Sequence, residues 1–596
     1  MQDLSYPRPQ LRREHWISLD GPWRFAFDHD MTCRVPGDVK EWPLMIEVPY
    51  APECARSGIG DQGFHRAVWY QREFDIDPEL FANGRRLIIH FGAVDYHARV
   101  WINDVPVAEH CGGHTPFSAD ITFAVNQSGP QRVTVWAEDD PQDLEKPRGK
   151  QDWRLHPHSI WYPRTTGIWQ TVWLEIVPPT YLSALRWTPS VERWELSFSA
   201  FTAGVPAEDL RISILLRCGP RILAHDTYAL IGGEVHRRMS LSDPGIDDYR
   251  NELLWSPERP TLLEADIALL RGNDIIDRVQ SYTALRSIAV QREKILLNGR
   301  PYTLRLVLDQ GYWPDTFMTA PSERALREDV VLAKSMGFNG VRKHQKLEDP
   351  RYLYWADVLG LLVWGEMPSA YRFTTRSINR LMREWTEAME RDISHPCVIM
   401  WVPFNESWGV PELSTTPAPR DAVAAFYHLT RTLDPSRLVV GNDGWESSAT
   451  DVIGIHDYDC DPSHMHLRYG PEVTPKELVE AQHGTAGRLL TLDGFPHRGQ
   501  PICLTEFGGV AFIPGTPDYR DKNWGYSRAR TEEEFEKLVC GVIEAARKTA
   551  MFSGFCYTQF ADTFQEVNGL IFADRTPKIP LEKIAEAVRG PPLMRS

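Results

Sequence analysis

The sequence predicts a three-domain chain: a jelly-roll β-sandwich over residues 1–178, an immunoglobulin-like β-sandwich over 179–288 and a (β/α)8 barrel over 289–596. Three observations predict it. Short alternating or apolar segments, separated by turns, fill the first half of the chain. The pair Pro178–Pro179 marks a boundary within that β region. After about residue 290, strand patterns alternate with helix patterns, which is typical of a parallel sheet covered by helices.

The two predicted sandwiches differ in their patterns. Residues 1–178 contain strand-like segments such as WRFAFD, RLIIHFG and QRVTVWAED and no convincing amphipathic helix, which favours a β-sandwich or jelly roll. Residues 180–288 contain about seven short strand patterns, as an immunoglobulin-like sandwich does. They show no Cys…Trp…Cys signature, so this second assignment rests on the strand pattern alone.

The last domain is predicted from eight strand patterns, which begin with YTLRLVLDQ and end with GFCYTQFADT. Helix patterns fall between most of them, and Ser322 and Thr531 are candidate first residues of two of these helices. Eight strands with intervening helices in about 300 residues is the count of a (β/α)8 barrel. The predicted helices cover residues 320–338, 349–361, 377–394, 420–433, 531–549 and 580–588.

Composition excludes several functional classes. The chain of 596 residues has a net charge of −16, which argues against a nucleic-acid binder because phosphate neutralisation dominates that affinity. No apolar run is long enough to span a membrane, and the N-terminus lacks an apolar leader, so we expect a cytoplasmic protein. The nine Cys include no CxxC pair, and no cluster has zinc-type spacing; we expect neither a metal nor a cofactor.

The polar residues that close the predicted barrel strands are candidates for a functional site, because catalytic groups of such barrels lie at the carboxyl ends of the strands. Glu406 follows the apolar run VIMWVPFN, and Glu506 follows PICLT. An unpaired carboxylate after a buried strand is costly, so two of them favour a shared chemical role. Paired carboxylates are what glycoside hydrolysis requires. The other candidates are Asp309, Gln310, Arg342, His344, Glu366, Asn405, His456, Tyr458 and Gln559.

Two segments make a family resemblance specific: HPCVIMWVPFNESWG (395–409) and ICLTEFGG (502–509). With TTGIWQTVWLE (165–175) and NGLIFADRTPK (568–578), they make the chain resemble glycoside hydrolase family 2 over almost its whole length. This family contains β-galactosidases, β-glucuronidases and β-mannosidases. Its domain order, jelly roll, immunoglobulin-like domain and barrel, is the order that the strand patterns predict.

The resemblance implies roles for five residues. Glu406 resembles the acid/base and Glu506 the nucleophile of a retaining exo-β-glycosidase. Asn405 resembles the residue that binds the sugar 2-hydroxyl, Arg342 the one that keeps the nucleophile ionised, and Tyr458 the one that contacts the nucleophile. Double displacement through a glycosyl-enzyme predicts about 5–5.5 Å between the two carboxyl groups.

The identity of the sugar is less constrained. The segment Asn568-Gly569-Leu570 has Leu where β-glucuronidases carry the Lys of their Asn-x-Lys signature, although Lys578 or Arg575 could substitute. Neutral and acidic candidates dominate the predicted pocket, so we expect a neutral sugar of β-galactoside type. An arabinoside or galactofuranoside is the second choice, and a β-glucuronide a further alternative. Substrate contacts are expected from Asp309, Gln310, His344, Glu366, His456, Trp408 and Gln559.

Several alternatives stay open. Trp364, Trp401 and Trp408 are candidates for an apolar wall beside the acid, or for core packing. The aromatic segment 148–162 either reaches the barrel mouth or makes an interdomain contact. A catalytically dead carbohydrate-binding protein and an endo-acting hydrolase are the competing functions. The expected partner is a carbohydrate substrate, and a homo-oligomer is possible by analogy.

Overall fold

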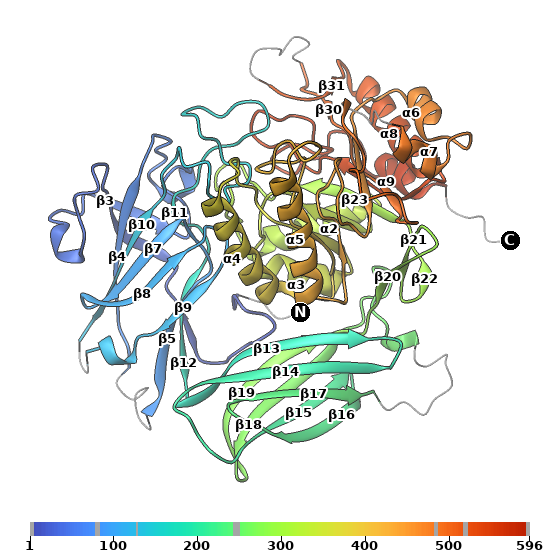
Figure 1. Cartoon of the computed structure of the whole chain (residues 1–596). Coiled ribbons are helices and arrows are strands. Elements are labelled where there is room, and N and C mark those ends of the chain that lie inside the picture. Colours follow the sequence, from blue (N-terminus) through green and yellow to red (C-terminus); the bar gives the residue numbers. More distant parts are fainter. Residues whose placement is uncertain are drawn as a thin grey trace.

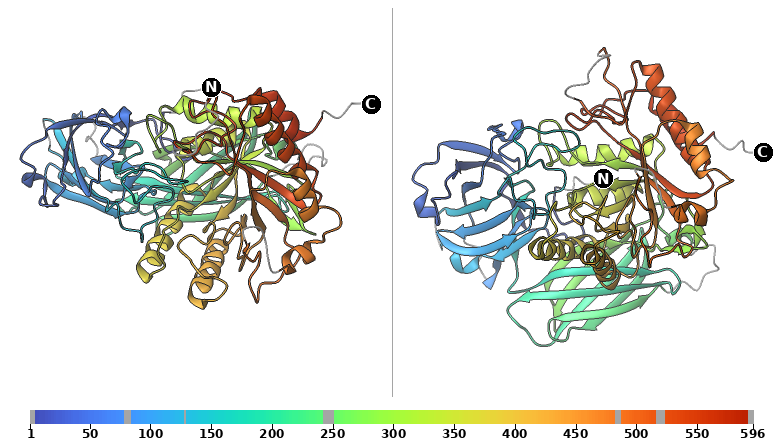
Figure 2. Two further views of the ribbon diagram at one scale, coloured as in Figure 1. Left: turned by 90° about the horizontal axis from the view of Figure 1, so that it is seen from above. Right: turned by 45° about the horizontal axis from the view of Figure 1, so that its top comes forward.

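The computed structural model describes residues 5–77, 84–126, 129–241, 251–481, 487–515 and 523–591. Figure 1 shows two β-sandwiches, coloured blue and green, against a barrel that runs from yellow to red. The first sandwich lies beside the barrel, and the second contacts a different side of it, as the two further views in Figure 2 confirm. In the described part of the chain, no helix is long and apolar enough to cross a membrane.

The first sandwich consists of two antiparallel sheets that enclose an aliphatic and aromatic core. Trp23, Tyr70 and Val135 belong to this core and are fully buried. The four-stranded sheet has the order β1 (Trp16–Ser18), β12 (Val172–Val177), β5 (Arg86–Phe91), β9 (Phe117–Asp120). The six-stranded sheet has the order β3 (Leu44–Val48), β2 (Gly21–Phe27), β4 (Ala67–Phe74), β10 (Gln131–Glu138), β7 (His97–Ile102), β8 (Val105–Cys111).

The second sandwich also has two antiparallel sheets, with Trp187, Phe198 and Ile267 in its core. One has the order β13 (Thr180–Ser190), β14 (Glu195–Gly204), β17 (Glu234–Ser240). The other has the order β16 (Arg221–Ala229), β15 (Leu210–Cys218), β18 (Leu263–Arg271), β19 (Asp274–Thr283). A small sheet of β20 (Ile288–Gln291), β21 (Lys294–Leu297) and β22 (Arg300–Pro301) leads into the barrel.

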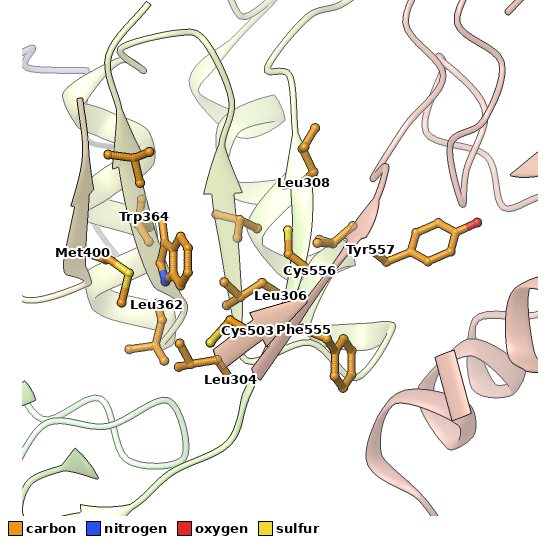
Figure 3. Packing of buried hydrophobic residues seen from close by; sticks show 14 of the residues in the cluster. Leu304, Leu306, Leu308, Leu362, Trp364, Met400, Cys503, Phe555, Cys556 and Tyr557 are labelled. Carbon is orange, nitrogen blue, oxygen red and sulfur yellow. The ribbon is translucent and has the colours of Figure 1, made fainter. Parts of the chain in front are cut away.

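Eight strands form one curled parallel sheet, and Figure 3 shows part of its core, including Leu306, Trp364 and Cys556. The spatial order is β27-β26-β25-β24-β23-β32-β29-β28. No ladder joins β27 to β28 among the residues that the structure describes. The strands are β23 (Leu304–Asp309), β24 (Gly340–Lys343), β25 (Leu362–Glu366), β26 (Val398–Val402), β27 (Leu438–Val439), β28 (Ile453–Asp457), β29 (Ile502–Gly508) and β32 (Phe552–Thr558).

Helices surround this sheet, and six of them match the predicted segments: α2 (Glu323–Ser335), α3 (Pro350–Leu359), α4 (Thr375–Asp392), α5 (Pro417–Leu433), α8 (Glu532–Lys548) and α9 (Leu581–Arg589). The Ser322 hydroxyl caps α2 by accepting from the Ala325 N–H, and Thr531 caps α8 similarly. The sequence prediction missed α6 (Pro462–Tyr469) and α7 (Pro475–Glu480), which are too short to establish a helical period.

Four short strands complete the described architecture. β6 (Val94–Asp95) pairs with β11 (Gly167–Ile168) in the first sandwich, and β30 (Val510–Ala511) pairs with β31 (Ser527–Arg528) beside the barrel mouth. Between β27 and β28 the chain forms a loop over residues 440–452 in place of a helix. This loop places Asn442 and Asp443 beside the segment that follows β26, since residues 405 and 443 form an isolated bridge.

Candidate active site

A fully buried arginine organises the carboxyl ends of the barrel strands. Arg342 lies near the end of β24, and its Nε donates to Glu366 Oε2 at 2.7 Å. Its Nη1 donates to Glu506 Oε1 at 2.9 Å and lies 2.9 Å from Asp443 Oδ2, while Nη2 donates to Asn405 Oδ1 at 2.6 Å. One planar guanidinium thus fixes groups from four other segments of the barrel.

Glu506 lies on β29, and cations and a hydroxyl surround its carboxylate. Besides Arg342, the Tyr458 hydroxyl donates to Glu506 Oε2, and His456 Nε2 lies 3.5 Å from Oε1. Burial alone would raise the pKa of Glu506, but the positive charges of His456 and Arg342 outweigh it and lower that pKa to about 2. Glu506 is therefore ionised at neutral pH.

Glu406 follows β26 in a strained loop. Its φ is 51° and that of Ser407 is 57°, a left-handed conformation that residues other than Gly seldom adopt. The Glu406 N–H donates to the Asp443 carbonyl at 3.0 Å, and the Ser407 N–H donates to Asn442 Oδ1 at 3.0 Å. These bonds hold the strained turn and direct a carboxylate that is 15% exposed toward the barrel axis.

His456 connects the two glutamates. Its Nδ1 lies 2.6 Å from Glu406 Oε1, and its Nε2 lies 3.5 Å from both Glu506 Oε1 and Asp443 Oδ2. One carboxylate oxygen of Glu406 and one of Glu506 lie within 4.8 Å of each other. Burial opposes the charged imidazolium, but the neighbouring carboxylates raise the pKa of His456 to about 10, so the ring is a cation at neutral pH.

Glu366 and His344 lie beside this centre. His344 Nδ1 is 3.0 Å from Glu366 Oε1, and the Gln345 amide donates to the same oxygen at 2.7 Å. The positive charges of Arg342 and His344 outweigh burial and lower the pKa of Glu366. Glu366 therefore orients Arg342, whereas the sequence predicted that Glu366 contacts the sugar.

A row of amides lies at the carboxyl ends of β23 and β32. Gln310, after β23, donates through Nε2 to Gln559 Oε1 at 2.8 Å, and Gln559 donates to Asn568 Oδ1 at 2.7 Å. Asn568 in turn donates to Glu566 Oε1 at 3.2 Å. The structure thus brings Gln310 and Gln559, both candidates from the sequence, into contact with each other, and adds Glu566, a loop residue outside any strand pattern.

Comparisons with known proteins identify the family of the chain. Residues 288–589 match the domain described as "Glycosyl hydrolases family 2, TIM barrel domain", and residues 16–145 match "Glycosyl hydrolases family 2, sugar binding domain". The chain belongs to glycoside hydrolase family 2. It is therefore a glycoside hydrolase acting on carbohydrate, and the alternative of a catalytically dead binding protein is set aside.

Relatives of this family 2 enzyme are named as glycosidases of different sugars. Beta-glucuronidase of Rattus norvegicus is 27% identical over 76% of this chain and 73% of its own length. Beta-galactosidase of Thermoanaerobacter pseudethanolicus is 26% identical over 61% of this chain and 48% of its own length. Among solved structures, a beta-D-glucuronidase of Dictyoglomus thermophilum superposes with a TM-score of 0.76 at 19% identity, covering 98% of this chain and 99% of the other.

Asp309 does not lie where a substrate contact was expected. The β-ladder pairs Leu308 with Arg342 and Asp309 with Lys343, and paired residues share a face of the sheet. Asp309 therefore faces away from the barrel interior, where its Oδ2 accepts from Lys343 Nζ at 2.7 Å and its Oδ1 from the Gly311 N–H at 2.9 Å. Both oxygens are used in structural bonds, so we remove Asp309 from the substrate contacts.

The three tryptophans that were candidates for an apolar wall beside the acid lie in different environments in this family 2 enzyme. Trp401 faces away from the interior, where its Nε1 donates to Asp434 Oδ2 at 2.8 Å, and Trp364 is buried in the barrel core. Only Trp408 is partly exposed at the mouth, with its ring centroid 5.9 Å from that of His344. The core-packing alternative therefore holds for Trp364 and Trp401.

The segment 148–162 of the first sandwich reaches the barrel mouth. Its Trp161 ring lies 6.4 Å from the Trp408 ring, and the Gln565 amide donates to the Trp161 carbonyl at 2.7 Å. Lys150 is buried, with Nζ 3.5 Å from Glu566 Oε2. This interdomain contact is also a wall of the mouth, so both alternatives for the segment hold. Sequence reasoning missed Lys150, which no strand pattern places near the barrel.

Proposed function

We propose that this family 2 enzyme is a retaining exo-β-glycosidase in which Glu506 is the nucleophile and Glu406 the acid/base. The observation that carries the proposal is the approach of the two carboxylates to within 4.8 Å on either side of His456. A separation of about 5–5.5 Å belongs to retaining enzymes, whereas inverting enzymes need about 6.5–9.5 Å to admit water.

In the first step, Glu506 attacks the anomeric carbon and forms an ester bond. The bond from that carbon to the leaving oxygen breaks, and the oxygen takes its proton from the Glu406–His456 pair. In the second step, water attacks the anomeric carbon, Glu406 accepts its proton, and Glu506 leaves as a carboxylate. Each turnover consumes one water molecule and restores both glutamates.

The electrostatics of the centre support this division of roles. Arg342 and His456 keep Glu506 ionised, as a nucleophile requires, and its pKa of about 2 leaves it a good leaving group in the second step. Glu406 is more exposed than Glu506, with 15% against 5% of the side chain accessible. The more accessible carboxylate is suited to exchange protons with the leaving oxygen and with water.

The sugar that we propose is neutral and of β-galactoside type. Among the described residues, the buried polar atoms around the centre that have no hydrogen-bond partner include Asn405 Nδ2, Trp445 Nε1 and Gln310 Oε1. Buried polar atoms of this kind require partners, and sugar hydroxyls supply both donors and acceptors. An arabinoside or galactofuranoside presents related hydroxyls and stays the second choice.

Two cations proposed from the sequence are engaged elsewhere. Lys578 Nζ donates to Asp562 Oδ1 at 2.7 Å and to the Val567 carbonyl, and the Arg575 guanidinium pairs with both oxygens of Asp329. Neither is free to bind a sugar carboxylate. With Leu570 fully buried in the core, this supports a neutral sugar at the site.

A panel of 4-nitrophenyl glycosides tests the proposal. It contains β-galactopyranoside, β-galactofuranoside, arabinopyranoside, arabinofuranoside, β-glucuronide and β-mannoside. We expect the highest kcat/KM with a neutral sugar, and NMR of the first-formed product to show the β anomer. An α-configured first product from a β-glycoside would contradict retention.

A β-uronide is the second candidate, and Lys150 is the observation that favours it. Its buried ammonium contacts the carboxylate of Glu566 at 3.5 Å, and two of the relatives described above are named for β-glucuronides. If a uronide were the substrate, Lys150→Met would lower kcat/KM for the uronide selectively. For a neutral substrate, the same change affects all sugars of the panel alike.

A further inference from the structure

Four aromatic rings from two domains meet at the barrel mouth. Trp153 and Trp161 come from the first sandwich, and Tyr371 and Trp408 from loops of the barrel. Ring centroids lie 5.0 Å apart for Trp153–Trp161, 5.3 Å for Trp153–Tyr371, 5.9 Å for Tyr371–Trp408 and 6.4 Å for Trp161–Trp408. All four side chains are partly exposed, so the cluster, which we call the aromatic platform, is not core packing.

Hydrogen bonds between the domains hold the platform in place. The Trp161 Nε1–H donates to the Tyr371 hydroxyl at 3.2 Å, and that hydroxyl donates to the Gly149 carbonyl at 2.6 Å. The Gln565 amide donates to the carbonyls of Ser159 and Trp161 at 2.8 and 2.7 Å. A surface whose rings are fixed before binding loses little conformational entropy when a ligand packs on it.

The platform adjoins the proposed acid/base. Trp408 is two residues from Glu406, and the backbone N–H of Trp408 donates to the Asn405 carbonyl at 2.8 Å. One tight turn therefore carries both side chains. Glu506, with Tyr458 and Tyr526, lies on the β28–β29 side of the centre, away from the turn after β26. A glycoside that places its anomeric carbon at Glu506 and its leaving oxygen at Glu406 directs its leaving group toward Trp408.

We propose that the aromatic platform binds the leaving group, and that it selects leaving groups with a flat apolar ring face, either an aryl ring or the apolar face of a second sugar. This inference rests on the proposed function and adds to it the class of aglycone. Trp161 and Trp408 form the contact surface, and Tyr371 fixes the Trp161 ring through its hydroxyl. Flat ring faces pack well against Trp, whose large apolar area dominates contact energetics.

Three glycosides of the preferred sugar test this inference: the 4-nitrophenyl glycoside, a disaccharide, and the glycosyl fluoride, which has no ring to contact the platform. We expect Trp161→Ala to lower kcat/KM for one or both ring-bearing substrates by about tenfold or more, equivalent to about 1.4 kcal/mol. The fluoride should stay within about twofold of wild type, which also shows that the variant folds. Trp161→Phe should recover most of the loss.

A matched control is Trp42→Ala, because Trp42 is also partly exposed but packs in the first sandwich away from the mouth. It should leave the kcat/KM of all three substrates unchanged. A loss with the aryl glycoside alone identifies an aryl aglycone, and a loss that includes the disaccharide identifies a sugar. An equal loss of kcat/KM with the fluoride, or no loss with either ring-bearing substrate, would overturn the proposal that the aromatic platform binds the leaving group. Failure of wild-type enzyme on every glycoside would instead overturn the proposed function.

Discussion

His456 Nδ1 lies 2.6 Å from Glu406 Oε1, which is a hydrogen-bond distance, and we infer that the imidazole and the carboxylate share one proton. The other ring nitrogen faces Glu506 and Asp443, whose charges favour the imidazolium. In the mechanism that we propose, the acid that protonates the leaving oxygen is thus a pair rather than a single glutamate. When Glu506 becomes an ester in the intermediate, one of the charges that holds this proton disappears, which favours the basic form needed to activate water.

His456→Asn should move the basic limb of the pH–rate profile. Because the pKa of His456 is raised to about 10, the wild-type pair keeps its proton as pH rises toward that value. Without the imidazole, the proton that His456 holds at alkaline pH is absent, so the basic limb of the kcat/KM profile should move to lower pH by at least about one unit. The measurement uses a substrate with a poor leaving group. A dinitrophenyl glycoside, which needs no acid, is the control, and an unmoved limb would contradict the shared proton.

Glu506→Ala should reduce hydrolysis by more than about 10⁴-fold, because removal of a covalent nucleophile abolishes the reaction path. The variant should nevertheless transfer sugar from an α-glycosyl fluoride to an acceptor, since the space left by the carboxylate admits the fluoride and Glu406 is intact. Product analysis by chromatography checks both outcomes. Residual hydrolysis near the wild-type rate would assign the nucleophile elsewhere.

Glu406→Ala should affect substrates according to their leaving groups. General acid catalysis contributes about 10²–10⁴-fold, so the loss should approach this range for a phenyl glycoside and be much smaller for a dinitrophenyl glycoside. Azide should restore part of the activity by attacking the glycosyl-enzyme and giving a β-glycosyl azide. The same fractional loss for both substrates would argue against the acid/base role.

Arg342→Met should lower the free energy of unfolding of the protein and also abolish its activity. The change leaves Glu366, Asp443 and Glu506 buried without their common cation, and breaking a buried ion pair from one side costs about 3–5 kcal/mol. Arg278→Met is the comparison, because Arg278 pairs with Asp266 at the surface and its loss should cost less than about 1 kcal/mol. Denaturant titrations give both values, and similar costs would contradict the central position of Arg342.

Glu384→Gln should stabilise the protein at alkaline pH. Glu384 is fully buried on α4 against the first sandwich, and burial raises its pKa to about 8, with the charges of Asp95 and Glu387 acting in the same direction. The unfolded chain ionises this group near 4.5, so the wild type loses stability as pH rises from there to about 8. The variant should be equal to wild type near pH 4.5 and more stable by roughly 1–3 kcal/mol at pH 8–9. Glu387→Gln, one turn later, should have the opposite effect, because the pKa of Glu387 is lowered.

The fold was predictable because its elements carry strong local patterns. The eight barrel strands are apolar runs closed by polar residues, and four of the six helices that the sequence predicted begin at a side-chain cap. The same alternation could have placed Asp309 correctly, because Asp309 is an odd number of positions from Leu306 and Leu308, whose side chains belong to the barrel core. The last polar residue of each strand was predicted to be a site residue without regard to the face of the sheet on which its side chain lies. Asp309 was therefore placed on the wrong face.

Other parts of the site could not be predicted from local pattern. The run LVVGND predicts that Asp443 follows a barrel strand, but the pattern does not show that its carboxylate lies 2.9 Å from Arg342 Nη1 or that residue 443 forms a bridge with Asn405. Lys150 and Trp161 come from another domain, so their place at the mouth depends on how two independently patterned units dock. Only the tertiary structure contains that information.

The contact between the Gln565 amide and the Trp161 carbonyl joins positions 404 residues apart in the chain. Because domains generally fold as units, this contact forms when two folded domains dock rather than while either domain folds. The barrel can therefore bring Glu406 and Glu506 together before the first sandwich supplies Trp153 and Trp161. In refolding, turnover of a glycosyl fluoride should return with the barrel, and discrimination among aglycones should return only when the two domains have docked.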